Sequence, residues 1–485
     1  MSRTALFFSF IDRYSGLIVT LATSMVLARL LTPEEIGVFS VTMVFLGIVA
    51  TVRDVGAGQY IVREPNLTED GVRATRTIQV SIGLALAVLT FLTARPLAAF
   101  YESEEITAIM HILAANFAVI PFGAVMVAVW TRELQFQKIA AMRFSGAIAG
   151  SATGISLAYL GHGAVSLAWS ALATQLTGVA VASLLWQGRF TLMPGLREIG
   201  KVFAFGGRVT AYSVIRSVME GIPEMFLARL QGMTATGLLS RGHGLVLLFD
   251  RLVMDAVGSV VFPVFSKTMR EGGDLTQTYM RVLAMVTVLG WSFFAILAVS
   301  AFPVIRILFG NQWDGAVSIT RILCLAFAIQ LPLRLTVTLL VTKGAIGLVV
   351  RTALISLIVT AVLCLIGASY GLHELGWGLV IANLVNLGLW MHTAHREICF
   401  ALAPMFRLTT VSLLIGAAAA APFLAVAQLF RFDGDLEDLF LLIPAGVMAM
   451  LLFIMLARRT RHAINSEIEH AVNAASALVK RSMKR

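Results

Sequence analysis

Long apolar stretches alternate with short polar segments along the whole chain. Fourteen of these stretches reach the roughly 20 helical residues that a hydrocarbon core about 30 Å thick requires. The connections are too short to hold an extramembrane catalytic domain. The pattern therefore predicts an all-α polytopic membrane protein. The predicted spans are residues 6–29, 35–57, 77–97, 106–130, 141–160, 164–187, 202–230, 236–263, 281–305, 316–341, 346–369, 376–398, 409–430 and 438–457.

Composition favours the same class of protein. The chain of 485 residues is 58% apolar and 13% charged, and its mean hydropathy is +0.86. Soluble globular chains are about 45–50% apolar and about 25% charged, so a soluble enzyme is excluded. The cysteines Cys324, Cys364 and Cys399 form no CxxC pair and have no histidine at ligand spacing. Neither a disulfide framework nor a metal site is predicted.

The formal net charge of +10 comes from basic residues that lie between the apolar stretches and form no single patch. This distribution argues against nucleic acid as a partner. With the N-terminus placed inside, the cytoplasmic segments hold 23 Lys and Arg, the outer connections five and the spans nine. Because Lys and Arg concentrate in cytoplasmic loops, we predict that both termini are cytoplasmic and that 100–105 and 431–437 are outer loops.

The two ends of the chain carry different signals. The first apolar run, residues 5–31, is too long for a signal-peptide core and lacks a small-residue cleavage site, so it is expected to remain as the first span. Residues 458–485 begin and end with basic clusters, and their apolar residues recur at near-helical spacing. Two interpretations of this tail stay open: a basic amphipathic helix on anionic lipid, or a solvated tail that only follows the positive-inside rule.

An internal repeat is visible at an offset of 200 residues. The segment ARLLTPEEIGVFS at 28–40 aligns with ARLQGMTATGLLS at 228–240, and five of thirteen positions are identical. The two segments are the turns after the first and the seventh span. Because an even number of spans between copies preserves orientation, we expect parallel repeats related by an axis along the membrane normal.

Further motifs carry a resemblance to a known family. LARLLTPEEIGVFSV at 27–41 is followed by RDVGAG at 53–58, VVFPVFSKTMREG lies at 260–272, and PVIRILFGNQWDGA lies at 303–316. With these motifs the chain resembles the Wzx-type polysaccharide flippases of the multidrug/oligosaccharidyl-lipid/polysaccharide exporter superfamily. The resemblance covers most of residues 5–340, and the last third resembles the family mainly in hydropathy.

The resemblance implies an architecture and a cargo. It implies two six-helix lobes at 1–200 and 201–400 related by a pseudo-two-fold axis, two added helices at 401–457, and the basic tail at 458–485. It also implies a transporter of the bacterial cytoplasmic membrane that moves undecaprenyl-diphosphate-linked oligosaccharide repeat units by alternating access, for exopolysaccharide, lipopolysaccharide O-antigen or capsule synthesis. The partners it implies are this lipid-linked cargo, membrane lipid and other polysaccharide assembly proteins.

Charged residues inside the predicted spans indicate a site independently of any family. An intramembrane charge costs at least about 2.5–3.5 kcal/mol on insertion scales, so it usually faces a cavity or an ionic partner. Guanidinium groups hold phosphate by bidentate, charge-assisted bonds. Five arginines are therefore predicted to line a cationic cavity for the cargo diphosphate: Arg13, Arg53, Arg216, Arg241 and Arg251. Supporting or ion-coupling roles are predicted for Asp12, Asp54, Tyr212, Glu220, Glu224 and Asp255.

Helical spacing assigns several of these residues to faces. On the seventh span, Tyr212, Arg216 and Glu220 follow one another at i+4 and share a face. On the eighth span, a regular helix of 100° per residue places three charges within about 80° of one another, namely Arg241, Arg251 and Asp255. Asp250 falls on a different face of that helix.

A second interpretation of these charges stays open. The i+4 spacing allows salt bridges between Arg216 and Glu220 and between Arg251 and Asp255, and these bridges could neutralise the charges without any role in cargo binding. Asp12 could likewise pair with an arginine of a neighbouring helix. Arg53 and Asp54 could lie at the cytoplasmic mouth as a gate, or at the membrane interface with their polar ends in water.

Two other classes of function fit the sequence less well. A drug or cation antiporter of the same superfamily would favour a few buried carboxylates in an apolar pocket over this arginine-rich set. A membrane glycosyltransferase or polymerase would need a large outer loop or a catalytic domain with paired carboxylates, and neither is predicted. The sequence favours a flippase without catalytic residues, metal or cofactor, and is compatible with coupling to a proton or sodium gradient.

Overall fold

The structure is a computed structural model of the chain. It describes residues 3–53, 57–187, 195, 199–398, 402–430, 432, 436–460, 462–465, 467 and 469. Within the helices it describes no side chains for 3–15, 17, 52, 57, 59, 63, 199–211, 259, 398, 402–404 and 436. The predicted amphipathic tail therefore lies almost wholly outside the described residues.

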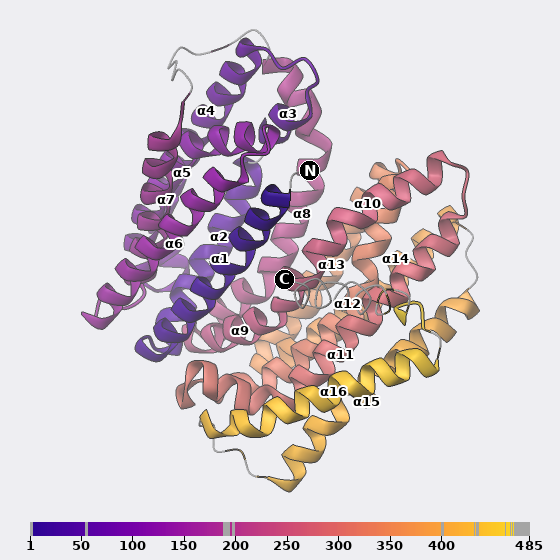
Figure 1. Cartoon of the computed structure of the whole chain (residues 1–485). Helices are drawn as coiled ribbons and strands as arrows, with labels where there is room; N and C mark the ends of the chain where they lie inside the picture. Colours follow the sequence, from indigo (N-terminus) through magenta and orange to yellow (C-terminus); the bar gives the residue numbers. More distant parts are fainter. Residues whose placement is uncertain are drawn as a thin grey trace, which may run out of the picture. The chain divides into compact units, whose positions relative to one another are not determined.

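The described residues form helices joined by turns, and they contain no strand (Figure 1). The helices begin and end near the predicted span boundaries, because their lengths are set by the apolar stretches. They are α1 (Arg3–Leu30), α2 (Pro33–Arg53), α3 (Ala57–Arg63), α4 (Glu69–Tyr101), α5 (Glu105–Arg132), α6 (Phe136–Tyr159), α7 (Val165–Leu185), α8 (Ile199–Gln231), α9 (Met233–Val246), η1 (Asp250–Met254), α10 (Asp255–Arg270), α11 (Leu275–Phe309), η2 (Asn311–Trp313), α12 (Ala316–Thr342), α13 (Ile346–Tyr370), α14 (Leu372–Ile398), α15 (Leu402–Leu429), η3 (Leu436–Asp438) and α16 (Leu439–Arg459).

The all-α membrane fold is confirmed. Within the described part, 10 helices are long and apolar enough to cross a membrane. The helices α1, α6 and α8 also lie at predicted spans but are not among these 10. The count of fourteen spans stays a prediction.

The second predicted span, 35–57, ends earlier than expected, because α2 stops at Arg53 and the short α3 follows. Arg132, at the end of α5, holds the end of α3. Its guanidinium donates hydrogen bonds to the carbonyl oxygens of Ile61 (2.7 Å), Glu64 (2.6 Å) and Pro65 (3.3 Å). The Ile61 carbonyl lies in the last turn of α3 and the other two lie just beyond it, so none has an intrahelical donor and one arginine serves all three.

The eighth predicted span, 236–263, is also not one regular helix. It consists of α9, a π-helical turn η1 and α10. A π-helical turn inserts a residue into the helical register. Faces worked out at 100° per residue therefore do not carry across Asp250–Met254.

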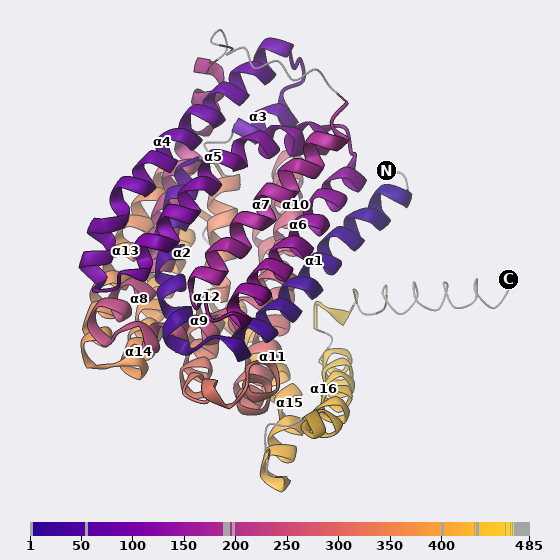
Figure 2. The same ribbon diagram turned by 90° about the vertical axis from the view of Figure 1, so that its left-hand side faces the viewer.

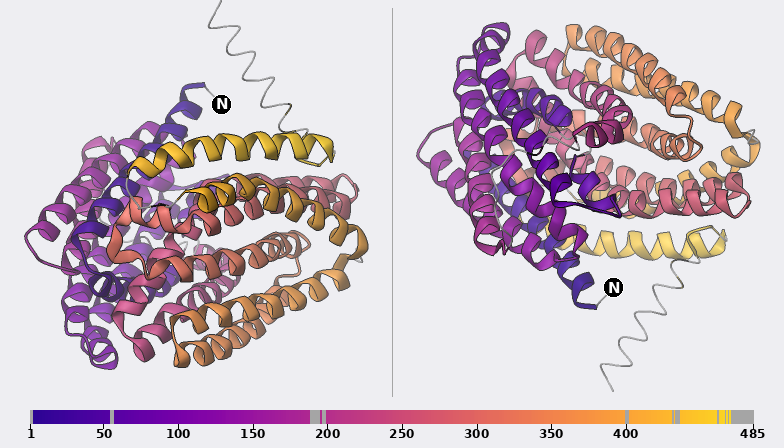
Figure 3. Two further views of the ribbon diagram at one scale, coloured as in Figure 1. Left: turned by 90° about the horizontal axis from the view of Figure 1, so that it is seen from below. Right: turned by 90° about the horizontal axis from the view of Figure 1, so that it is seen from above.

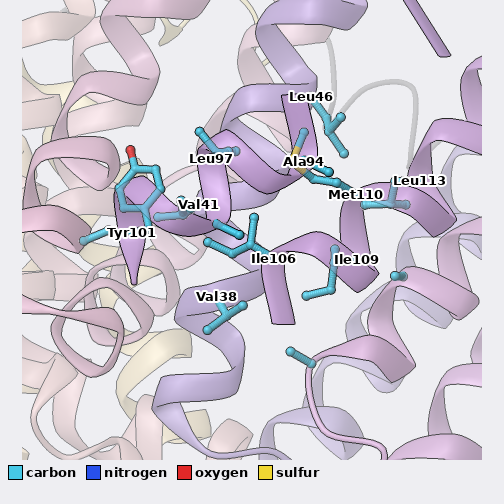
Figure 4. Close-up of a cluster of buried hydrophobic side chains, with 14 of the residues drawn as sticks. Val38, Val41, Leu46, Ala94, Leu97, Tyr101, Ile106, Ile109, Met110 and Leu113 are labelled. Atoms are coloured by element: carbon cyan, nitrogen blue, oxygen red, sulfur yellow. The ribbon is translucent and has the colours of Figure 1, made fainter. Parts of the chain in front are cut away.

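The chain divides into two compact units, Met1–Ser240 and Arg241–Arg485. In the first unit, α4 packs on α5, α6 on α7, α1 on α6, and α2 on α8 (Figures 1 and 2). Its core gathers apolar side chains of α2, α4 and α5 (Figure 4), among them Val41, Leu97, Ile106 and Ile109. The predicted lobes, 1–200 and 201–400, stay predictions.

The close contact between α6 and α7 depends on small residues at four-residue spacing. A Cβ at Gly146 would lie 2.7 Å from the carbonyl oxygen of Thr174, and a Cβ at Gly150 would lie 1.9 Å from its Oγ1. Small residues let helix backbones approach closely in a membrane, where van der Waals packing drives association.

In the second unit, α11 packs on α15, α15 on α16, and α12 and α13 on α14 (Figure 3). A row of hydrogen bonds joins α13 to α14. The Nδ2 of Asn386 donates to Thr360 Oγ1 (3.1 Å) and the Nε1 of Trp390 donates to Ser356 Oγ (3.0 Å). Both pairs are buried, so these polar groups satisfy each other away from lipid.

Candidate functional site

The helices α2 and α8 lie side by side and run antiparallel. Thr51 Oγ1 lies 2.7 Å from Ser217 Oγ, and a Cβ on Gly221 would lie 2.3 Å from Val44 Cγ1. Further along the same contact, Ser40 meets Glu224. The second predicted span, which follows the first copy of the repeated turn, and the seventh, which precedes the second copy, are therefore direct neighbours.

The internal repeat brings its own matched residues together. Gly37 of α2 and Gly237 of α9 cross in backbone contact, because a Cβ on Gly37 would lie 3.0 Å from the Gly237 nitrogen and a Cβ on Gly237 would lie 3.2 Å from the Gly37 nitrogen. Three residues on, Ser40 Oγ lies 2.9 Å from Ser240 Oγ. Two pairs of identical residues at an offset of 200 are thus in contact.

Glu224 is a buried carboxylate beside this crossing. Its side chain is 7% exposed, and Ser40 Oγ lies 2.5 Å from its Oε2. A carboxylate can only accept hydrogen bonds, so Ser40 donates to Glu224. Ser40 Oγ also lies 2.9 Å from Ser240 Oγ, so the Ser40 hydroxyl lies between the carboxylate and the second serine.

Arg216 and Glu220 form the predicted i+4 ion pair on α8. The Nε of Arg216 donates to Glu220 Oε1 at 2.8 Å. The two side chains remain 48% and 45% exposed. Tyr212, one turn earlier, is half-buried. Arg53, also half-buried, lies two residues beyond the Thr51 contact with Ser217, so the α2–α8 register brings it to the depth of this pair.

Arg241 occupies an aromatic cage in the second unit. Its guanidinium lies over the ring of Phe309, 5.2 Å from the centroid, and over the ring of Trp313, at 5.1 Å. Trp313 is fully buried. A desolvated guanidinium over two rings gains about 2 kcal/mol or more from cation–π attraction. This arrangement suits a structural role for Arg241, and whether it also binds cargo stays a prediction.

The PVIRILFGNQWDGA motif builds this cage. Gly310, at φ 99°, ends α11 and turns the chain into η2. Arg306 and Asp314 then close the turn, with Arg306 Nη2 2.7 Å and Arg306 Nε 2.9 Å from the carboxylate oxygens. This ion pair closes the segment that contains both aromatic residues of the cage, Phe309 and Trp313.

Arg251 and Asp255 are both exposed, whereas Arg241 is packed against aromatic rings. Arg241 thus has a different environment from Arg251 and Asp255, and the π-helical turn Asp250–Met254 interrupts the regular helix from which their shared face was predicted. The partner of Asp250, the first residue of that turn, is not predicted from the sequence. Arg334 of α12 lies 2.5 Å from it, and both side chains are largely buried. Both charges are visible within apolar stretches, but nothing in the sequence pairs them.

Several predicted residues cannot be placed. Asp54 and the side chains of Asp12 and Arg13 lie outside the described residues. Among the residues that are described, no group of three His, Cys, Asp or Glu is arranged to hold a metal ion.

Comparison with known sequences indicates one family. The sequence model of a family described as polysaccharide biosynthesis protein matches residues 26–318, a range that contains all of the motifs quoted above. Lipopolysaccharide biosynthesis protein WzxC of Escherichia coli (strain K12) is 23% identical over 305 residues, which are 62% of this chain and 61% of WzxC. Succinoglycan biosynthesis transport protein ExoT of Rhizobium meliloti (strain 1021) is 25% identical over 370 residues, 75% of this chain and 74% of ExoT.

Solved structures show the same fold. The lipid II flippase MurJ, in an inward closed conformation, superposes with a TM-score of 0.73 at 14% identity, covering 95% of this chain and 100% of MurJ. An inward-facing multidrug resistance transporter of the MATE family gives a TM-score of 0.66 at 16% identity, covering 81% of this chain and 98% of that one.

Proposed function

Because the chain belongs to the polysaccharide biosynthesis protein family, we propose that it is a flippase for a lipid-linked oligosaccharide. Its cargo is an undecaprenyl-diphosphate-linked repeat unit, which it moves across the bacterial cytoplasmic membrane for surface polysaccharide synthesis. The names of WzxC and ExoT support this proposal, and the fold shared with MurJ is compatible with it. The protein acts as a transporter and makes or breaks no covalent bond.

The observation that carries the mechanism is the position of the Arg216–Glu220 pair. The 33 residues of α8 extend about 50 Å at 1.5 Å per residue, and Arg216 lies at the middle of that length. Both side chains of the pair are nearly half exposed. Charges exposed to hydrocarbon at mid-membrane depth are strongly unfavourable, so this face of α8 lines a water-filled route. A route with an arginine at its centre suits an anionic diphosphate.

The antiporter alternative rests on fold likeness to MATE transporters, and at 16% identity that likeness carries the fold alone. Glu224 is the residue that a coupling role would use, because it is a buried carboxylate within reach of a neighbouring helix. We include coupling to a proton or sodium gradient through Glu224 as a secondary part of the proposal.

Deletion of the gene tests the main proposal. Undecaprenyl-linked repeat units should accumulate on the cytoplasmic face, and surface polysaccharide should fall. A plasmid copy of the wild-type chain should restore export and clear the intermediates. Loss of polysaccharide without accumulated lipid-linked units would instead place the defect before translocation and contradict a flippase.

A further inference from the structure

A groove lies in the first unit between the end of α4 and the start of α5. Its volume is about 650 Å³. The opposite faces of the same helix ends belong to the buried core, where Leu97, Tyr101 and Ile106 pack (Figure 4). The groove thus opens away from the core. Its polar and small lining residues include Arg95, Ala99, Glu102, Glu104, Thr107 and His111.

Two opposite charges in this groove are not compensated by the protein. Glu102 pairs with Arg229 of α8 at 3.2 Å. The side chains of Arg95 and Glu104 form no ion pair or hydrogen bond with any residue that the structure describes, and the Glu104 side chain makes no capping bond to α5. The groove therefore presents one positive and one negative charge to whatever occupies it.

An apolar path leads into the groove along α4. Leu84, Val88 and Leu92 are exposed at four-residue spacing on the stripe that ends near Arg95. Phe91, exposed on the same helix, stacks on the ring of His111 with centroids 4.2 Å apart. Four-residue spacing keeps side chains on one helix face. A polar groove is thus continuous with a stripe that faces hydrocarbon.

The depth of the groove matches the headgroup region. Arg95 lies seven residues before the cap Glu102, which is about 10 Å along the helix. Bilayers are about 30 Å thick in the hydrocarbon core and about 40–45 Å with headgroups. A groove about 10 Å from the end of a membrane-spanning helix suits the region where lipid phosphates meet the acyl chains.

We propose that this groove binds one phospholipid with a zwitterionic headgroup that carries a primary ammonium, the chemistry of phosphatidylethanolamine. Arg95 holds the phosphate by charge-assisted hydrogen bonds, with His111 beside it. Glu104 accepts hydrogen bonds from the ammonium, and an acyl chain follows the stripe of α4. The site shares no residue with the proposed cargo route, so it stands whether or not the chain is a flippase.

The test measures lipid binding to the purified full-length protein by native mass spectrometry. Phosphatidylethanolamine should bind about tenfold more tightly than phosphatidylcholine, whose quaternary ammonium has no N–H donor. Arg95→Ala should weaken phosphatidylethanolamine binding about tenfold. The control Arg407→Ala removes an exposed arginine of α15 and should leave binding unchanged.

Glu104→Gln should remove the preference over phosphatidylcholine, and Glu104→Arg should shift it toward anionic phosphatidylglycerol. Each variant must keep the thermal unfolding midpoint of the wild type. If Arg95→Ala and Arg407→Ala retain equal amounts of phosphatidylethanolamine, the bound lipid is non-specific and the proposal is wrong. Displacement of the lipid by inorganic phosphate at equal concentration would show a free-anion site and would also overturn it. If Arg95→Ala does not fold, the Glu104 variants alone decide the outcome.

Discussion

Gly37 and Gly237 are in backbone contact, and the close approach leaves no room for a side chain on either residue. A Cβ on Gly37 would come within 1.9 Å of the carbonyl oxygen of Met233, and a Cβ on Gly237 within 1.8 Å of that of Pro33. The two glycines correspond in the internal repeat at an offset of 200. The repeat therefore marks a place where two copies of one turn pack on each other.

Gly37→Ala and Gly237→Ala should each destabilise the protein. Overpacking typically costs about 1–3 kcal/mol, and here the methyl group would meet backbone atoms that cannot rotate away. Matched controls exist on the same helices, because Gly47 of α2 and Gly244 of α9 have nothing within 4 Å of a built Cβ. At those positions alanine should be neutral or stabilising, by up to about 1 kcal/mol. Thermal unfolding of the four variants makes the comparison, and equal midpoints would count against the contact.

A disulfide between Ser40→Cys and Ser240→Cys should form readily, because the two oxygens are 2.9 Å apart. The native cysteines Cys324, Cys364 and Cys399 are first replaced by alanine. If α2 and α9 separate during transport, oxidation should stop export and a reductant should restore it. The control pair Gly47→Cys and Ser240→Cys lies about two helical turns out of register and should not crosslink. Full export with a complete bridge would show that this crossing stays closed.

Substitutions at Arg216 distinguish a role in cargo binding from a role in ion pairing. If it binds the diphosphate, Arg216→Ala/Glu220→Ala should export as little polymer as Arg216→Ala, at least about tenfold below wild type. Arg216→Lys should be intermediate, since it keeps the charge and loses the bidentate fork. Export is normalised to membrane-inserted protein. Rescue by the double substitution would show that the arginine only neutralises Glu220.

Arg241 should behave as a structural residue. Arg241→Met loses cation–π contacts with Phe309 and Trp313 that contribute about 2 kcal/mol or more, so the thermal midpoint and the inserted amount should fall. Export per inserted molecule should stay near the wild-type level. Arg351→Met, at an exposed position of α13, serves as the matched control. If Arg241→Met inserts normally but does not export polymer, Arg241 takes part in cargo binding.

His462 should make the C-terminal segment sensitive to acid. The ring Nδ1 accepts a hydrogen bond from the Ile464 amide (3.3 Å), and Nε2 lies 3.1 Å from Ser412 Oγ. Burial lowers the pKa of His462 below its ordinary value, so the folded state favours the neutral ring. Its contribution to stability is present above about pH 6.5, the ordinary histidine pKa, and is lost as the pH falls through the lower folded-state pKa.

Thermal unfolding at pH 7.5 and pH 5.5 tests this dependence. The midpoint of the wild type should fall more on acidification than that of His462→Gln, which cannot take up a proton. Parallel shifts in the two proteins would show that other groups govern the acid response.

The positions of the helices could be predicted because the hydrocarbon thickness sets a length that apolar stretches must match. The family was predicted from motifs, and the match over residues 26–318 confirms it. The orientation of Asp255 relative to Arg241 could not be predicted, since a helical wheel assumes a constant period and η1 lies between them. The ion pair between Asp250 and Arg334 depends on which helices become neighbours, and no local pattern contains that information.

The hold of Arg132 on the end of α3 has a consequence for biogenesis. The arginine follows Ile61 by 71 residues, and ribosomes add about 5–20 residues per second. The carbonyl oxygens of Ile61, Glu64 and Pro65 therefore lack their arginine donor for roughly 4 to 14 s, while α4 and α5 are synthesised. Until then water must serve them, so α3 has to stay outside the hydrocarbon. The hydrogen bonds from Arg132 to the end of α3 can form only after α4 and α5 have been inserted. The end of α3 therefore reaches its final structure after these two helices.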